Sequence, residues 1–149
     1  MARPLLTILI VDDEPGIRRS LGESLSEEGY AVLKAESGEQ ALELLQNPNS
    51  EGIHLMLLDV WLPGMDGLAG LASLRAHMPT LPIIVVSADE RHATVDAALR
   101  AGVSGFIPKS FSRADMAAAV NAVLDGDIFF PATSDRNTGA PPAYDPGMT

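Results

Sequence analysis

The chain has 149 residues, a net charge of −10 at neutral pH and no cysteine. This length suits one compact domain with a single core, and the lack of thiols excludes disulfides, zinc–thiolate sites and cysteine nucleophiles. The 20 acids outnumber the 10 Lys and Arg residues, which opposes direct binding to nucleic acid because phosphate contacts need clustered cations.

The apolar segments of the sequence are too short for a membrane protein. None approaches the ~20 residues that span a bilayer, and residues 1–4, which precede the first apolar run, are too few for a signal peptide. A chain without cysteine also fits a reducing compartment. We therefore expect a cytoplasmic protein that makes no membrane contact.

Apolar runs and helical patterns alternate along the chain. Residues 5–11 form a continuous apolar run, which predicts a strand buried on both faces of a parallel sheet. A helix then begins at Pro15 and ends at Gly29. Residues 30–34 predict a second strand, and Ser37 caps the helix that follows. The remaining expected elements are strands over residues 54–58, 83–86 and 104–107, and helices around residues 68–74, over 93–101 and over 114–124.

The repeated order of strand then helix predicts the fold class. Five such repeats indicate an α/β protein with a doubly wound parallel sheet and helices on both faces. We expect the flavodoxin-like (βα)5 fold with strand order 2-1-3-4-5. Residues 1–130 would form this domain. Residues 131–149 are rich in Pro, Gly, Asp and Asn, which predicts a flexible tail or an interdomain linker.

Polar residues follow the predicted strands at one edge of the sheet. The first strand ends in three acids at positions 12–14, the third in Asp59 and the fourth in Ser87, and Lys109 follows the fifth. Ligands of such folds bind beyond the carboxyl ends of the strands, where the strand order reverses. Each of these residues alone has an ordinary structural explanation as a cap, a turn or a solvated side chain. Their joint pattern indicates a functional site.

The clustered aspartates Asp12, Asp13 and Asp59 predict a bound cation. Carboxylates a few ångströms apart repel one another, and a hard cation with oxygen ligands relieves that repulsion. Three carboxylates, one Mg²⁺ ion and one lysine sum to about zero charge, which leaves room for an incoming anion. The charge balance therefore favours phosphoryl chemistry.

Four segments of the sequence resemble the receiver-domain family of two-component response regulators, and the resemblance extends from about residue 6 to 130. The segments are residues 11–14 (VDDE), 58–67 (LDVWLPGMDG), 86–88 (VSA) and 105–109 (GFIPK). The run 105–110 and the ending 123–131 resemble the receivers of NarL/LuxR-type regulators. The resemblance implies a sensor histidine kinase or a phosphotransfer protein as phosphoryl donor, with output either as a stand-alone receiver or as part of a transcriptional regulator. A homodimer or a downstream output domain is the expected partner. It implies no enzymatic activity beyond phosphoryl transfer to and hydrolysis from the chain itself.

The resemblance also assigns roles to individual residues. It makes Asp59 the phosphoacceptor, with Asp13, Asp59 and the backbone carbonyl of Trp61 as direct Mg²⁺ ligands and Asp12 as a ligand through water. Mn²⁺ is a possible substitute. Lys109 would pair with the phosphoryl oxygens. The residues expected to bind the phosphoryl group or carry the switch are Ser87, Ala88, Phe106 and Lys109.

In the expected switch, Ser87 donates a hydrogen bond to the phosphoryl group, the loop at Ala88 moves, and Phe106 turns inward. Trp61 and Asp89 flank the path of an attacking water and would set the lifetime of the phosphorylated state. Phe106 and Trp61 also have an alternative role in ordinary packing. Ser110 stands where many receivers have a proline after a cis peptide, which leaves the isomer of that bond open.

One alternative from the enzyme class is a phosphohydrolase of the haloacid dehalogenase type. Such enzymes also use an aspartate at a strand end together with Mg²⁺. They require a second acid two residues later, and Trp61 stands at that position. The sequence therefore favours the receiver.

Overall fold

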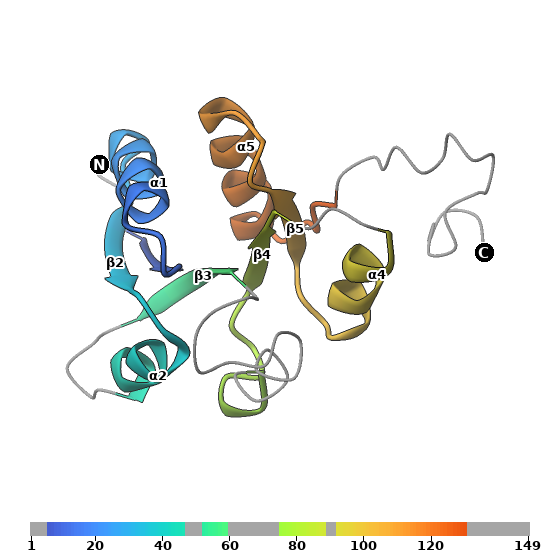
Figure 1. Cartoon of the computed structure of the whole chain (residues 1–149). Coiled ribbons are helices and arrows are strands. Elements are labelled where there is room, and N and C mark those ends of the chain that lie inside the picture. The colour runs from blue at the N-terminus through green and yellow to red at the C-terminus, as the bar shows by residue number, and fades with distance from the viewer. Residues whose placement is uncertain (1–5, 47–51, 60–74, 89–91, 131–149) are drawn as a thin grey trace.

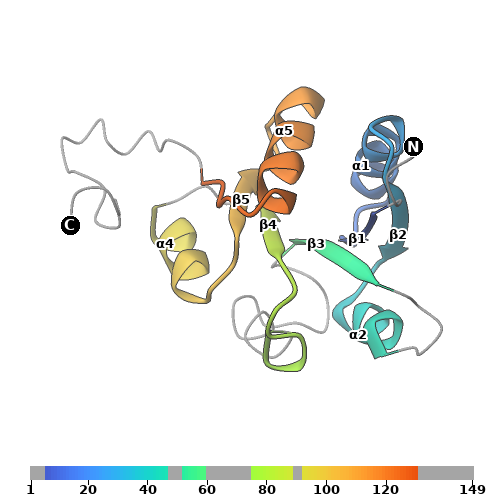
Figure 2. The same cartoon turned by 180° about the vertical axis from the view of Figure 1, so that it is seen from behind.

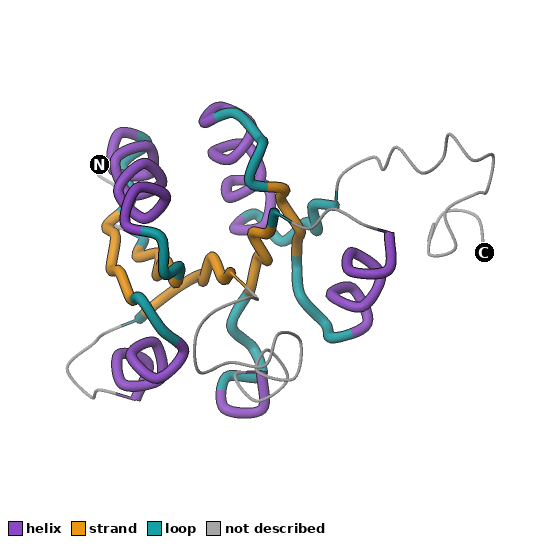
Figure 3. Tube along the Cα trace, viewed as in Figure 1, coloured by secondary structure: helices purple, strands orange, loops and turns teal. Residues whose placement is uncertain are grey.

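The computed structural model describes residues 6–46, 52–59, 75–88 and 92–130 (Figure 1). Its strands are β1 (Thr7–Val11), β2 (Ala31–Ala35), β3 (Ile53–Asp59), β4 (Ile83–Ser87) and β5 (Gly105–Pro108). Its helices are α1 (Pro15–Glu27), α2 (Gly38–Gln46), α4 (His92–Arg100) and α5 (Arg113–Leu124). The helix expected around residues 68–74 lies outside the described residues. Figure 3 shows the strands and helices alternating along the trace.

The five strands form one parallel sheet in the order β2-β1-β3-β4-β5, which confirms the predicted flavodoxin-like topology. Strand β1 pairs with β2 and β3, so that Val11 lies between Ala35 and Leu58. On the other side of β3, Asp59 pairs with Val86, and Ser87 pairs with Pro108 of β5. These registers bring the carboxyl ends of four strands to one edge of the sheet.

Two apolar clusters fill the two faces of the sheet. Helices α1 and α5 cover one face, and α2 and α4 cover the other (Figures 1 and 2). Alternating residues of β1 supply both clusters: Ile8 and Ile10 pack toward α1 and α5, whereas Leu9 and Val11 pack on the other face. Burial on both sides explains why these strands read as continuous apolar runs. In the described part of the chain, no helix is long and apolar enough to cross a membrane.

Local signals fixed several element ends as expected. Pro15 occupies the first turn of α1, and the Ser37 hydroxyl accepts a hydrogen bond from the Gln40 N–H at 3.1 Å, which caps α2. Gly29 ends the first helical pattern with φ of 98°, a left-handed conformation that a side chain disfavours. The predicted strands and helices differ from the observed ones by one or two residues at their ends.

The segment after α5, residues 127–130, folds back along the outer edge of β5. The Phe106 N–H donates to the Phe129 carbonyl at 2.9 Å, and the Phe129 N–H donates to the Ser104 carbonyl at 2.9 Å. The Phe129 ring also meets Phe111 edge to face, with ring centroids 6.1 Å apart. A Cβ atom at Gly105 would lie 2.9 Å from the Phe129 carbonyl oxygen, so this close approach needs glycine. The segment therefore satisfies backbone groups that an open edge strand would expose.

Candidate functional site

The polar residues expected at the sheet edge come together in the structure. Asp12 follows β1, Asp59 is the last residue of β3, and Lys109 follows β5. They converge because parallel neighbouring strands end at the same edge of the sheet. Backbone hydrogen bonds fix this edge: the Asp12 N–H donates to the Ala35 carbonyl at 3.1 Å, and the Lys109 N–H donates to the Ser87 carbonyl at 3.0 Å.

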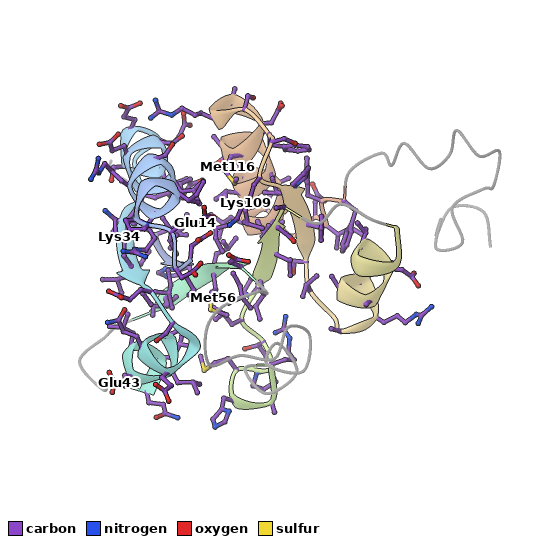
Figure 4. The ribbon with its side chains drawn as sticks, viewed as in Figure 1. Glu14, Lys34, Glu43, Met56, Lys109 and Met116 are labelled. Atoms are coloured by element: carbon purple, nitrogen blue, oxygen red, sulfur yellow. The ribbon has the colours of Figure 1, made fainter. Side chains whose placement is uncertain are left out.

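Lys109 is the centre of the site (Figure 4). Its ammonium nitrogen donates to Glu14 Oε1 at 2.6 Å and to Asp59 Oδ2 at 3.1 Å. It also forms an ion pair with Asp12 Oδ2 at 3.2 Å. One cation thus serves three carboxylates, and the site keeps an excess of negative charge.

The surroundings of Lys109 and Asp12 shift both pKa values upward. Burial acts to lower the pKa of Lys109, but hydrogen bonds from its ammonium to Glu14 and Asp59 and the charge of Asp12 outweigh that effect and raise the pKa. The lysine therefore stays protonated. For Asp12, burial is the largest cause of a raised pKa and the charge of Asp59 adds to it, against the opposing effects of the Glu14 N–H and Lys109. The site holds Asp12 in a position where a second cation would stabilise its charged form.

The carboxylates at this edge fit a hard cation. One oxygen each of Asp12, Glu14 and Asp59 lie within 4.8 Å of one another. Asp12 Oδ2 is buried and has no hydrogen-bond partner, since its contact with Lys109 is an ion pair without hydrogen-bond geometry. A buried charged oxygen without a hydrogen bond is costly, and oxygen-only ligand sets suit Mg²⁺. The residues present therefore fit the cation that the sequence predicts.

The turn after β1 is held by its own hydrogen bonds. The Glu14 N–H donates to Asp12 Oδ1 at 2.9 Å, and Arg18 Nη1 donates to the Asp12 carbonyl at 2.6 Å. These contacts orient Asp12 toward Asp59 from the first turn of α1. Asp13, expected as a direct ligand of the cation, is exposed and does not belong to the group formed by Asp12, Glu14 and Asp59.

The residues expected to carry the switch lie close to this group. Ser87 is fully buried at the end of β4, and Ala88 is exposed directly after it. Phe106 is also fully buried, in the cluster that contains Val85 and Val103. The structure thus has the Phe106 ring already inward, where the sequence analysis expects it only after phosphorylation. The peptide between Lys109 and Ser110 is trans. Trp61 and Asp89 lie outside the described residues.

Among the contacts of Lys109 within the described residues, Glu14 is the one to which the sequence assigns no role. It lies 95 positions from Lys109 in the chain, and its side chain makes the shortest contact with the lysine. The available signal was the third consecutive acid after the first strand, because that turn and Lys109 both follow strands at the same edge of the parallel sheet. Acids are also common at the start of a helix, which hid the specific contact.

Comparisons with known proteins agree with this geometry. The family model described as "Response regulator receiver domain" matches residues 8–121. The "Glycerol metabolism activator" of Pseudomonas putida is 36% identical over 126 residues, which cover 83% of this chain and 56% of that protein. Among solved structures, a LuxR family DNA-binding response regulator from Silicibacter pomeroyi is 35% identical with a TM-score of 0.75, covering 86% of this chain and 98% of that one.

A receiver domain from Methanospirillum hungatei JF-1, described as CheY-like, is 30% identical with a TM-score of 0.74 and covers 82% of this chain and 95% of that one. The chain spans about half the length of the curated relatives it matches. The matched residues include both Asp12 and Asp59 as well as Lys109. A haloacid dehalogenase-type phosphohydrolase is not favoured by any of these findings. The chain belongs to the family of response regulator receiver domains of two-component systems.

Proposed function

We propose that Asp59 accepts a phosphoryl group from a sensor histidine kinase in a Mg²⁺-dependent reaction. The observation that carries this proposal is the contact of Lys109 Nζ with Asp59 Oδ2 at 3.1 Å, beside further carboxylate oxygens that fit a cation. A carboxylate oxygen of Asp59 attacks the phosphorus, a new O–P bond forms, and the donor leaves with the electron pair of the broken bond. The product is an acyl phosphate.

Asp13, Asp59 and the backbone carbonyl of Trp61 would hold the Mg²⁺ ion directly and Asp12 through water, with Mn²⁺ as a possible substitute. Because Asp13 is exposed and lies outside the group of Asp12, Glu14 and Asp59, its carboxylate would have to turn toward the ion. When bound, the ion would offset the negative charge of the transferred group. Lys109 would bind phosphoryl oxygens through its protonated ammonium, because its pKa is raised and its position beside Asp59 is fixed. The chain's own contribution is the placement of these charges.

The first test is self-phosphorylation by a small donor. Acetyl phosphate with Mg²⁺ should add the mass of one phosphoryl group to the intact chain, and the adduct should be stable in acid but released by base or hydroxylamine. Excess chelator should prevent it, since the carboxylates of the site repel the donor without a cation. Equal adduct formation with and without chelator would contradict the proposed metal dependence.

We propose that the acyl phosphate acts on the surface formed by α4, β5 and α5. Ser87 would donate a hydrogen bond to the phosphoryl group, the loop at Ala88 would move, and Phe106 would respond at β5. Ser87 pairs with Pro108 in the sheet, which supports a path from the end of β4 to β5. The proposed output is a homodimer or an output domain of a DNA-binding regulator such as the LuxR family relative. Because a sensor histidine kinase is the proposed donor, we expect the reaction to take place in the cytoplasm. We expect no direct binding of nucleic acid by this receiver.

Trp61 and Asp89 are proposed to set the lifetime of the phosphorylated state. They stand two positions beyond Asp59 and Ser87 in the sequence. Hydrolysis needs a water in line with the bond being broken, which an indole obstructs and a carboxylate orients. Trp61→Asn should accelerate loss of the acyl phosphate several-fold while Mg²⁺-dependent phosphorylation persists. The decay of the adduct, followed by intact mass, gives the rate, and an unchanged or slower decay would leave Trp61 with a packing role alone.

A further inference from the structure

Lys109 has as many close carboxylates as it has protons to donate. Its ammonium nitrogen lies 2.6 Å from Glu14, 3.1 Å from Asp59 and 3.2 Å from Asp12. An ammonium group offers three donors and no acceptor. Glu14 and Asp59 already take two of these donors, and Asp12 lies within ion-pair distance. A phosphoryl group on Asp59 brings several new anionic oxygens to the same place, so these oxygens compete with the present carboxylates for Lys109.

Burial decides which partner is released. The side chains of Asp12 and Asp59 are 2% and 5% exposed, whereas that of Glu14 is 58% exposed. A carboxylate that can turn into water loses little when its ion pair breaks, whereas a buried one retains its desolvation cost. The Glu14 backbone meanwhile stays fixed, because its N–H donates to Asp12 Oδ1. Its side chain can therefore leave Lys109 without disturbing the turn.

We propose that Glu14 is a positioning residue that holds Lys109 in the unphosphorylated receiver and competes with the phosphoryl group for it. The proposal rests on the proposed function of Asp59 and adds a residue that limits how tightly the phosphorylated state is held. In the resting site Glu14 keeps the lysine beside the phosphoacceptor. After phosphoryl transfer, the phosphoryl oxygens replace Glu14 as the hydrogen-bond acceptor of Lys109.

Beryllofluoride, which binds aspartate carboxylates as a phosphoryl mimic, measures this competition without turnover. Glu14→Gln should bind beryllofluoride about twofold to fivefold more tightly than the wild type at saturating Mg²⁺, since an ion pair this exposed has only a modest strength to lose. Saturating Mg²⁺ removes any change in metal affinity from the comparison. The affinity can be read from amide shifts during a titration.

Two further variants separate contact from charge. Glu43→Gln, on the exposed surface of α2, makes the same change in net charge away from Lys109 and should bind beryllofluoride as the wild type does. Glu14→Asp keeps the charge but is one methylene shorter, so it should fall between the wild type and Glu14→Gln. Tighter binding in Glu14→Gln, an unchanged Glu43→Gln and an intermediate Glu14→Asp together support the competition.

Other outcomes overturn it. Unchanged or weaker binding in Glu14→Gln means that Glu14 does not compete for Lys109. A Glu14→Asp variant equal to the wild type, or a Glu43→Gln variant as tight as Glu14→Gln, assigns the effect to charge alone. If the wild type itself binds no beryllofluoride with Mg²⁺, the proposed function of Asp59 fails instead, and the two failures are thereby distinguished.

Discussion

Replacing Asp59 by asparagine should abolish the acyl phosphate. The amide nitrogen and oxygen of asparagine are far weaker nucleophiles than a carboxylate, so phosphorylation by acetyl phosphate with Mg²⁺ should fall below about 1% of the wild-type level. Asp59 lies at the end of β3 with Lys109 at 3.1 Å, so the loss removes the group on which the whole site converges. Intact mass spectrometry after incubation with donor measures it.

An aspartate away from the site provides the control for this substitution. Asp125 is exposed at the end of α5, and Asp125→Asn changes the net charge equally. It should phosphorylate as the wild type does. A persistent phosphoryl adduct in Asp59→Asn would show that a different residue is the nucleophile.

Ser87→Ala should separate the chemistry from the switch. The Ser87 side chain is fully buried at the end of β4, next to the β3 end that carries Asp59. Without its hydroxyl, the site loses one hydrogen-bond donor to the phosphoryl group while Mg²⁺ and Lys109 remain, so phosphorylation should stay within a few-fold of the wild type. The amide shifts of α4, β5 and α5 on adding beryllofluoride should largely disappear, because nothing then links the phosphoryl group to the Ala88 loop.

Ser26→Ala, an exposed serine on α1, serves as the matched control and should keep the full set of shifts. If the α4, β5 and α5 amides of Ser87→Ala respond as fully as those of the wild type, Ser87 does not carry the signal. Since Phe106 is buried among core residues in the structure, its amide is the most sensitive reporter at β5.

Most of the fold could be predicted because its strands are buried on both faces. Runs such as residues 8–11 and 83–86 contain no polar residue, and this pattern occurs in parallel sheets covered by helices. Strand ends were less certain. The last strand extends to Pro108, which has no N–H to donate, because the Lys109 N–H donates to the Ser87 carbonyl at 3.0 Å and continues the pairing with β4.

The site could be predicted only in part, since its contacts join distant parts of the chain. Asp12, Asp59 and Lys109 follow strands, so topology alone brings them together. The Glu14 contact depends on how α1 begins, and the position of Phe106 depends on the packing of α4 against β5. The return of residues 127–130 along β5 could not be predicted either, because Phe129 and Phe130 give no periodic pattern and the backbone partners of Phe129 lie more than 20 positions earlier. Side-chain placement of this kind follows from tertiary packing.

The most direct test of the account locates the phosphoryl group in the chain. After acetyl phosphate treatment with Mg²⁺, borohydride reduces an aspartyl phosphate to homoserine, and tandem mass spectrometry of the peptides identifies the changed residue. We expect homoserine at position 59 in samples with Mg²⁺ and not in samples with chelator. Homoserine at position 12 or 13 instead of 59, or no reduced residue in a chain that carries the phosphoryl mass, would contradict it.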